Sequence, residues 1–528
     1  MENFFEYTNG ELFCESVSVS SIKDFLQKQS FKTVSPVFVY SKNQIVSNVN
    51  AYKLAMKKLE INAVLNYAMK ANMNPTVLKI MKDLGCSVTL VSGNELALAL
   101  KVGFDLRTMI LNGNGKQKWE IELAVKHGCL LNIDGMFNLE QTIEVCRRLG
   151  TKARVLLRVN PNIPLDDYVR NFTSIAYSQG VHQYNRTGVH GSKFGIERRE
   201  LAAMAEVVCR EPLLELQGLH CHLGSTITDI RVFRCAAEAM LADIRELRKH
   251  DFPNIRVINL GGGLGIDYTK RSSSTQNPCA NEKSAIDNAK RGIPTPSEVI
   301  SVIDSVFKDD DVSLILEPGR SLIGNAVILL TEVIGVKHGH HMNYIVVDGS
   351  MTEVVRPALY GAYHHIDLAQ PSHVTNADTH TNDRSHVTTS DTQYITAQHR
   401  QMTKTDGQTE NPFSFTSGKE NPAELGKRTP TDGRSDEVNE GWGSGRQTYE
   451  VVGPVCESGD FLGHARSLRT PHTGCLMAVF DVGAYCGSMA SNYNMRPRPA
   501  EVMVDGKEVK VIRRPDTFDD ILRPYTWD

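Results

Sequence analysis

The sequence predicts an α/β protein in which a (β/α)8 barrel is followed by a second, mostly β domain, and three observations support this. From about residue 43 to 320, short apolar runs alternate with amphipathic stretches of helical period. After about residue 321, strand-like runs follow one another without helices between them. The length of 528 residues also exceeds what one compact core holds. A doubly wound open sheet is the alternative to the barrel, because a count of strands does not exclude it.

Eight apolar runs are the predicted barrel strands. Helical period is clearest between them at 95–102, 119–127 and 139–149, and Ser92 stands three residues ahead of Glu95, the spacing of a capping box. The predicted strands are Ala63–Lys70, Ser87–Val91, Met109–Asn112, Leu130–Asp134, Arg154–Asn160, Leu216–His222, Val257–Leu260 and Ser313–Glu317.

The second domain is predicted to be a β-barrel or sandwich built from both ends of the chain. We expect residues 1–42 to join it, 43–320 to form the barrel, and 321–528 to supply most of its strands. Its predicted strands are Pro36–Tyr40, Val327–Val336, Tyr344–Val347, Thr448–Val455 and Leu476–Asp481.

Three stretches read as insertions, at about 166–179, 268–292 and 369–446. The longest is rich in Thr, Ser, Asn, Asp, Gln, His and Gly and has few large apolar residues. Such a composition buries too little surface to offset the entropy of ordering, so we expect a disordered insertion.

Composition excludes several classes of function. A net charge of −3 gives no electrostatic reason to expect a nucleic-acid or membrane partner. The eleven cysteines are scattered without paired zinc-ligand spacing, which indicates reduced thiols in a cytosol-like compartment and no metal. The first residues lack both a hydrophobic signal core and a transit-peptide character, so we expect a cytoplasmic protein, with an organelle left open.

Lys70 ends the first predicted strand, in the stretch NYAMKAN. Alternation places Asn66, Ala68 and Lys70 on one face, so that Lys70 points into the barrel mouth, where barrel enzymes do their chemistry. A solvated lysine is the ordinary interpretation of such a position. An ammonium among small inward-facing residues must however be neutralised, paired or used covalently, which makes Lys70 a candidate.

Two histidines end the sixth predicted strand, in GLHCHLGS. Without a third ligand at metal spacing, His220 and His222 favour a packed pair over a zinc site. His222 is the better candidate for a flat ring at the barrel mouth, with Gly224 and Ser225 as hydrogen-bond donors after it.

Four glycines follow the seventh predicted strand in NLGGGLGIDY, and the eighth strand ends in LILEPGR. A glycine-rich turn directly after a barrel strand lets backbone N–H groups approach a phosphate, although a flexible turn is the plainer interpretation. Glu317 and Arg320 place an acid and a permanent cation at the same mouth, where a simple ion pair is the alternative. The glycines are Gly261, Gly262, Gly263 and Gly265.

A lysine, a ring, a phosphate-sized glycine turn and a carboxylate thus converge on one rim. Pyridoxal 5′-phosphate needs these four groups: an amine partner, a ring support, a phosphate cradle and an acid beside its pyridine nitrogen. Each motif alone is weak, and the combination predicts a pyridoxal-phosphate enzyme.

The same motifs resemble a known family, the fold-type III pyridoxal-phosphate decarboxylases that act on ornithine, arginine or diaminopimelate. The shared motifs are YAMKAN, HCHLGS, GGGLGIDY and EPGR. Five further stretches resemble the diaminopimelate branch, namely FEYTNGELFCE, SKFGI, RPALYGAYH, CESGD and GAYCGSMASNYNMRPRPAEV.

The resemblance implies a role for each matching residue. Lys70 would carry the cofactor as a Schiff base, His222 would stack on its ring, and Glu317 would pair with the pyridinium nitrogen. Ser225, Gly262, Gly263 and Tyr485 would hold the phosphate. The distal carboxylate of the substrate would bind Arg320, Arg356 and Tyr360. Arg320 would also contact the cofactor, and Tyr485 would also contact the substrate. Cys456, as proton donor, and Glu457 would enter from the second subunit of an obligatory homodimer.

The implied reaction is decarboxylation of meso-2,6-diaminopimelate to L-lysine and CO2, the last step of lysine biosynthesis. Another basic amino-acid decarboxylase, for ornithine or arginine, is the nearest alternative, and the carboxyl-terminal motifs argue against it. A non-catalytic regulatory relative is a third possibility, but such proteins usually lose the lysine or the interface cysteine, and both are present here.

Overall fold

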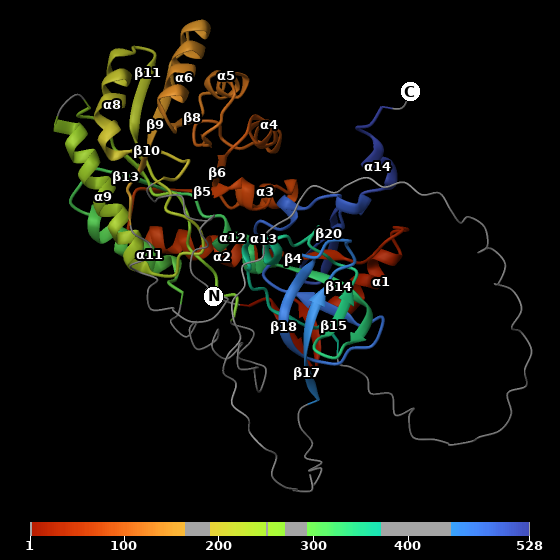
Figure 1. The fold of residues 1–528 in the computed structure, drawn as a ribbon. Coiled ribbons are helices and arrows are strands. Elements are labelled where there is room, and N and C mark those ends of the chain that lie inside the picture. Colours follow the sequence, from red (N-terminus) through yellow and green to blue (C-terminus); the bar gives the residue numbers. More distant parts are fainter. Residues whose placement is uncertain (1–2, 164–190, 250–251, 270–292, 371–444, 527–528) are drawn as a thin grey trace, which may run out of the picture. The chain divides into compact units, whose positions relative to one another are not determined.

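The computed structural model describes residues 3–163, 191–249, 252–269, 293–370 and 445–526. Its first part is a closed barrel of eight parallel strands, and Figure 1 shows several of these strands among the helices that connect them. Around the barrel the order is β9-β11-β12-β13-β5-β6-β7-β8, and pairing of β8 with β9 closes the ring. The predicted barrel is therefore confirmed, and the open sheet is excluded. The strands are β5 (Ala63–Ala68), β6 (Ser87–Leu90), β7 (Ile110–Leu111), β8 (Leu130–Ile133), β9 (Ala153–Asn160), β11 (Leu214–His220), β12 (Val257–Asn259) and β13 (Ser313–Leu316).

Helices connect the strands. The capping box predicted at Ser92 forms only in part, because the Glu95 side chain accepts from the Val91 N–H and not from Ser92. Ser92 caps α4 by accepting a hydrogen bond from the Glu95 amide, and Thr295 caps α11 in a reciprocal capping box with Glu298. The short strand β10 (Ile196–Glu197) adds to β9. The helices are α2 (Lys42–Lys58), α3 (Pro75–Asp83), α4 (Gly93–Val102), α5 (Lys118–Lys126), α6 (Met136–Leu149), α8 (Leu201–Arg210), α9 (Ile230–Lys249), α11 (Pro296–Phe307) and α12 (Arg320–Ile323).

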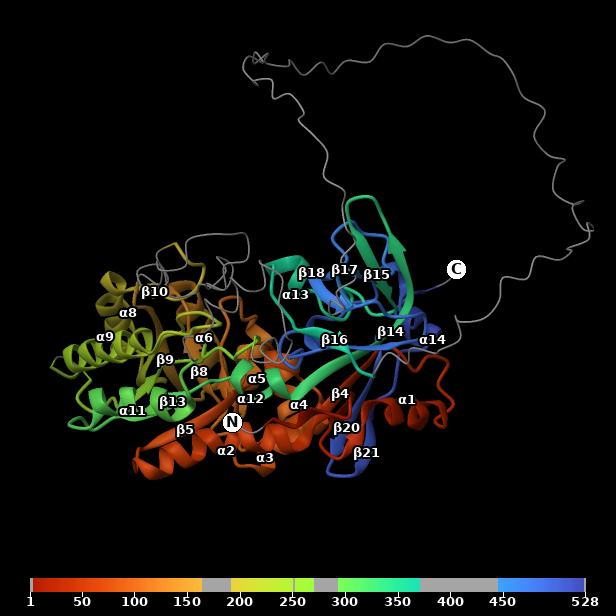
Figure 2. The same cartoon turned by 90° about the horizontal axis from the view of Figure 1, so that it is seen from below.

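The second part is a β-sheet that draws strands from both ends of the chain (Figure 2). Its order is β18-β17-β15-β14-β4-β20-β21, and β19 pairs with β14 and β16. The strands are β4 (Val37–Ser41), β14 (Val327–His338), β15 (Asn343–Val347), β16 (Ile366–Leu368), β17 (Arg446–Val452), β18 (Phe461–Arg469), β19 (Leu476–Val479), β20 (Ala500–Asp505) and β21 (Glu508–Arg513).

Several short elements lie outside the barrel and the larger β-sheet. A three-stranded sheet, β1-β2-β3, precedes α1, and α13 and α14 are single-turn helices in the second half. Their bounds are β1 (Phe5–Thr8), β2 (Glu11–Cys14), β3 (Val17–Ser18), α1 (Val19–Gln27), α13 (Arg356–Tyr360) and α14 (Phe518–Leu522).

A chain of polar contacts ties the barrel mouth to the β-sheet. The Asn72 amide, two residues after Lys70, donates to the Tyr40 hydroxyl of β4 over 2.8 Å. That hydroxyl donates in turn to Glu501 of β20, also over 2.8 Å. All three side chains come from different parts of the sequence, so the turn that carries Lys70 is held against the sheet.

The predicted insertions fall largely outside the described residues. The insertion at 166–179 lies wholly outside them, and the other two lie outside apart from their ends. Those ends belong to the fold. Ala369 is buried; its carbonyl accepts a hydrogen bond from the Leu12 N–H and its own N–H donates to the Leu476 carbonyl. Arg446 is the first residue of β17. Tyr268, the first residue of the second insertion, makes side-chain contacts near the barrel mouth. Among the described helices, none is long and apolar enough to cross a membrane.

Candidate active site

A cavity of about 260 Å³ opens at the carboxyl ends of the barrel strands. Its wall is formed by residues at or just beyond those ends, as the barrel architecture requires of an active site. Nine of the twelve predicted site residues line it: Lys70, His222, Ser225, Gly263, Glu317, Arg320, Arg356, Tyr360 and Tyr485.

Lys70 reaches the cavity from a turn and not from the strand that the sequence predicted. β5 ends at Ala68, and Met69–Ala71 form one turn of 3-10 helix. The alternation argument therefore fails for the last residue, because the backbone leaves the strand geometry before it. Lys70 is exposed, as an amine that must meet a ligand needs to be.

His222 also lies beyond its strand, since β11 ends at His220. Its Nδ1 accepts a hydrogen bond from the Gly262 backbone N–H over 3.2 Å, so the ring hydrogen is on Nε2. Burial, and then the nearby Lys70 ammonium, hold the pKa of His222 well below its usual range. The ring is thus neutral and fixed in orientation at neutral pH, as suits a group that supports a flat cofactor.

The glycine turn after β12 packs too closely for side chains. A Cβ on Gly262 would lie 2.2 Å from the Glu317 carbonyl oxygen. Gly263 has φ +114°, and a Cβ there would lie 2.5 Å from the Gly224 carbonyl oxygen. Gly262 is therefore required where this turn touches the next strand, and it does not line the cavity, whereas Gly263 does.

Glu317, directly after β13, is buried within a shell of donors. The Asn259 amide donates to its Oε1 over 2.8 Å, and the Asn112 amide donates to its Oε2 over 3.0 Å. His220 Nε2 lies 3.4 Å from Oε2. Burial alone raises the pKa of this carboxyl, but His220 and the amide donors outweigh burial and lower the pKa to about 2. Glu317 is an anion at neutral pH.

A second layer of polar groups stands behind Glu317. The side-chain amide of Asn132 donates to His220 Nδ1 over 2.9 Å. The buried Lys116 ammonium donates to the backbone carbonyl of Asn132 over 2.7 Å. Burial lowers the pKa of His220 below its ordinary value and that of Lys116 to about 8. The packed histidine predicted from the sequence is thus part of the support of the carboxylate.

Arg320 and Arg356 are buried and share one partner. The Tyr268 hydroxyl oxygen accepts from Arg320 Nη1 over 2.5 Å and from Arg356 Nη1 over 3.1 Å. Arg320 also donates to the Ser225 hydroxyl over 3.1 Å. Among the described residues, no carboxylate lies within 4 Å of either guanidinium, so the simple Glu317–Arg320 ion pair is excluded.

Cys456 and Glu457 do not line this cavity and are exposed. Their loop is nevertheless held firmly. Asp460 accepts from the backbone of Met351 and Val455, and Asn494 accepts from the Cys456 N–H over 2.8 Å.

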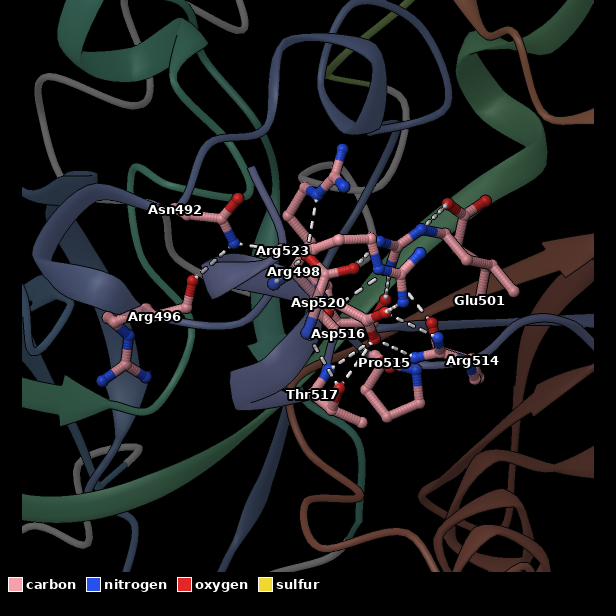
Figure 3. A network of polar contacts seen from close by, with 12 residues as sticks. Asn492, Arg496, Arg498, Glu501, Arg514, Pro515, Asp516, Thr517, Asp520 and Arg523 are labelled. Carbon is pink, nitrogen blue, oxygen red and sulfur yellow. Dashed lines mark hydrogen bonds and ion pairs between the residues drawn. The ribbon is translucent and has the colours of Figure 1, made fainter. Parts of the chain in front are cut away.

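A polar network holds the segment that carries Asn494 (Figure 3). The Asp516 carboxylate accepts from the Asn492 amide over 3.2 Å and from Arg498 Nε over 2.9 Å, on either side of Asn494. Arg513 also pairs with Asp516, while Arg514 and Arg523 pair with Asp520 of α14. The carboxyl-terminal turn thus supports the Cys456 loop indirectly, through the segment that carries Asn494.

Sequence reasoning missed several residues of the site. Asn112 directly follows β7 and Asn259 ends β12, so a search for polar residues at every strand end could have found both. Tyr268 was assigned to an insertion because of the composition that follows it. Arg158 and Phe194 also line the cavity, and the Arg158 guanidinium carbon lies 4.5 Å from the Phe194 ring centroid. Phe194 belongs to the SKFGI stretch, to which sequence reasoning gave no role.

The site thus holds each group that pyridoxal 5′-phosphate needs, and comparison with known families agrees. Residues 42–324 match the pyridoxal-binding domain of the pyridoxal-dependent decarboxylases, and residues 397–483 match their carboxyl-terminal sheet domain. The chain belongs to this family of pyridoxal-dependent decarboxylases, and its cofactor is pyridoxal 5′-phosphate.

Within the family, the chain falls in the branch of the diaminopimelate decarboxylases. It is 36% identical to a probable chloroplastic diaminopimelate decarboxylase of Oryza sativa, over 98% of this chain and 83% of the relative. It is 31% identical to the diaminopimelate decarboxylase of Aquifex aeolicus, over 99% and 97%. The structure of the M. jannaschii diaminopimelate decarboxylase with L-lysine superposes with a TM-score of 0.74 at 26% identity, covering 99% and 98%.

Proposed function

We propose that this chain decarboxylates meso-2,6-diaminopimelate to L-lysine and CO2, the last step of lysine biosynthesis. One observation carries the choice of substrate. Arg320 and Arg356 are buried at the cavity wall, and within the described structure neither has a carboxylate partner. Two buried cations without an anion are costly, so a ligand that brings a second carboxylate into the cavity is strongly favoured.

The positions of the residues around the cavity support the following cofactor-binding roles. Lys70 would supply the amine that binds the cofactor covalently, and the neutral His222 ring would support its face. Ser225, Gly263 and Tyr485, which line the cavity, would hold the phosphate near Arg320. Gly262 does not line the cavity and its N–H already donates to His222, so it would support this turn without binding the phosphate itself. When bound, the cofactor supplies an electron sink for the bonding pair left behind when CO2 departs.

The protein contributes charge and proton control around that chemistry. Glu317, whose pKa is lowered to about 2, remains an anion in the buried site and would hold a proton on the pyridine nitrogen of the bound cofactor. Arg356 and Tyr360, together with Arg320, orient the distal end of the substrate, and Tyr485 contacts it from the same wall. Cys456 delivers the proton that replaces the lost carboxylate on the α-carbon.

Recognition of the distal carboxylate separates diaminopimelate from ornithine and arginine. A substrate that lacks this group leaves the two guanidiniums buried and unpaired, and sites built around such pairing discriminate strongly. The ornithine and arginine alternatives are therefore not favoured. A non-catalytic role is not favoured either, since Lys70 lies in the cavity together with His222, Ser225 and Glu317.

We further propose a homodimer in which each active site takes Cys456 and Glu457 from the partner. Both residues are exposed in the described chain and are absent from the lining of its own cavity. Beside them, the side chains of Tyr493 and Met495 are 48% and 47% exposed, which is apolar surface that association would cover. Glu457 would meet the distal ammonium of the substrate. The cytoplasmic location stays a prediction.

The test is CO2 release by purified, cofactor-loaded protein with meso-diaminopimelate, L-lysine, L-ornithine and L-arginine in parallel assays. Release from diaminopimelate alone is expected. Release from ornithine or arginine would overturn the substrate assignment while leaving the fold and cofactor in place. No release from any of the four would refute the catalytic function.

A further inference from the structure

We propose that Tyr268 is a positioning residue for substrate recognition: it holds Arg320 and Arg356 together so that both guanidiniums address the distal carboxylate. The inference rests on the proposed function and deepens it. Tyr268 does not line the cavity, so it acts through the two arginines that do.

The contacts place one phenol oxygen between two cations. Tyr268 Oη accepts a hydrogen bond from Arg320 and another from Arg356. Both guanidinium carbons also lie over the tyrosine ring, at 5.9 Å and 5.3 Å from its centroid. Like charges so close together repel in a buried site, and the electron-rich oxygen and ring offset that repulsion.

His364 fixes the other side of this arrangement. Its Nδ1 lies 2.9 Å from the Phe480 carbonyl, so Nδ1 carries the hydrogen and Nε2 is left to accept from Arg356 over 2.8 Å. Burial, and then the charge of Arg356, hold the pKa of His364 well below its usual range, which keeps this acceptor neutral. The Tyr268 and His364 rings meet edge to face, with centroids 5.3 Å apart.

Arg356 therefore has two acceptors, Tyr268 and His364, and neither carries a full negative charge. A carboxylate partner would have cancelled the charge that the substrate must meet. A phenol and a neutral imidazole orient the guanidiniums but leave their charge available. This is the reason why a tyrosine at this position serves recognition better than an acid would.

The inference is tested with Tyr268→Phe, which removes the oxygen and keeps the ring. Because each guanidinium loses an acceptor, we expect KM for meso-diaminopimelate to rise about tenfold, while kcat stays within about twofold. Tyr449→Phe is the matched control, since the Tyr449 hydroxyl bonds Thr470 over 2.7 Å outside the cavity, and it should leave both constants unchanged.

A binding experiment without turnover separates positioning from general loosening of the site. L-lysine keeps the distal carboxylate of the substrate, and cadaverine is the same molecule without it. By calorimetry on the cofactor-loaded protein, Tyr268→Phe should weaken L-lysine about tenfold and leave the affinities for cadaverine and cofactor within about twofold.

The remaining outcomes would refute either the positioning role of Tyr268 or the proposed function. Equal weakening of L-lysine and cadaverine, or a loss confined to cofactor affinity, would refute the positioning role. An unchanged KM with an active wild-type enzyme would refute it as well, and would leave the proposed function intact. A wild-type protein that does not act on diaminopimelate would instead refute the proposed function itself.

Discussion

The buried ion pair between Arg158 and Asp134 allows a quantitative test of how the barrel mouth is built. Arg158 Nη1 lies 3.0 Å from Asp134 Oδ1, and the two side chains are 7% and 2% exposed. The other oxygen of Asp134 accepts from the Gly195 backbone N–H over 3.0 Å. Removing one partner of such a pair leaves a buried charge without compensation, which costs about 3–5 kcal/mol.

The perturbation is a double-mutant cycle with Arg158→Met and Asp134→Asn. Each single variant should lower the free energy of unfolding by about 3 kcal/mol or more, for the reason above. The double variant contains neither charge. Its loss of unfolding free energy should therefore be clearly smaller than the sum of the losses in the two single variants, with a coupling energy of about 2–3 kcal/mol. The surface pair of Lys118 and Glu144 is the control. Its side chains are 53% and 57% exposed, so its coupling should stay below about 1 kcal/mol.

The assay is urea unfolding followed by fluorescence and circular dichroism. Because Arg158 lines the cavity, the cycle is measured at two cofactor concentrations, which separates any change in ligand binding from a change in folding. Strictly additive single variants would refute the reasoning, since they would mean that the two charges do not depend on each other. An Arg158–Asp134 coupling energy as small as that of the Lys118–Glu144 surface pair would refute the reasoning as well.

Four further predictions follow from the site. Lys70→Ala should abolish the visible absorbance of the bound cofactor, and a retained band would remove Lys70 from its role. Mixing inactive Lys70→Ala with inactive Cys456→Ala protein should restore part of the activity, and absence of rescue would count against shared sites. Glu317→Gln should lower the free energy of unfolding by about 3 kcal/mol at pH 7. The reason is that a carboxyl whose pKa is lowered to about 2 in the folded protein stabilises the fold at any pH above the unfolded-state pKa near 4.3. In urea titrations, the difference from wild type should persist down to about pH 4.5 and shrink as the pH falls further toward 2. Asn494→Ala should lower kcat severalfold with little change in cofactor affinity, because the Cys456 N–H loses its acceptor, and an unchanged kcat would argue against that role.

Local signals were sufficient for the eight strands, whereas their closure into a barrel was decided by the pairing of β8 with β9 in the structure. The strands were predictable because each is a short apolar run bounded by helical period, and a parallel barrel buries such strands on both faces. The strand ends were less accurate: β5 stops at Ala68 and β11 at His220, because the turns that present Lys70 and His222 begin there. A periodicity argument cannot see where the backbone leaves the sheet.

Chemistry-bearing residue types at strand ends identified the centre of the site, since parallel strands that close into a barrel bring those ends together whatever the loops between them do. Lys70, His222, the glycine turn and Glu317 were found in this way. Contacts between side chains distant in sequence were beyond such reasoning. Only the tertiary structure placed Tyr268 between Arg320 and Arg356 and surrounded Glu317 with Asn112 and Asn259. Composition alone assigned Tyr268 to an insertion. The sequence shows which charged and polar residues are present, but which of them contact one another is decided by the packing of elements that lie far apart along the chain.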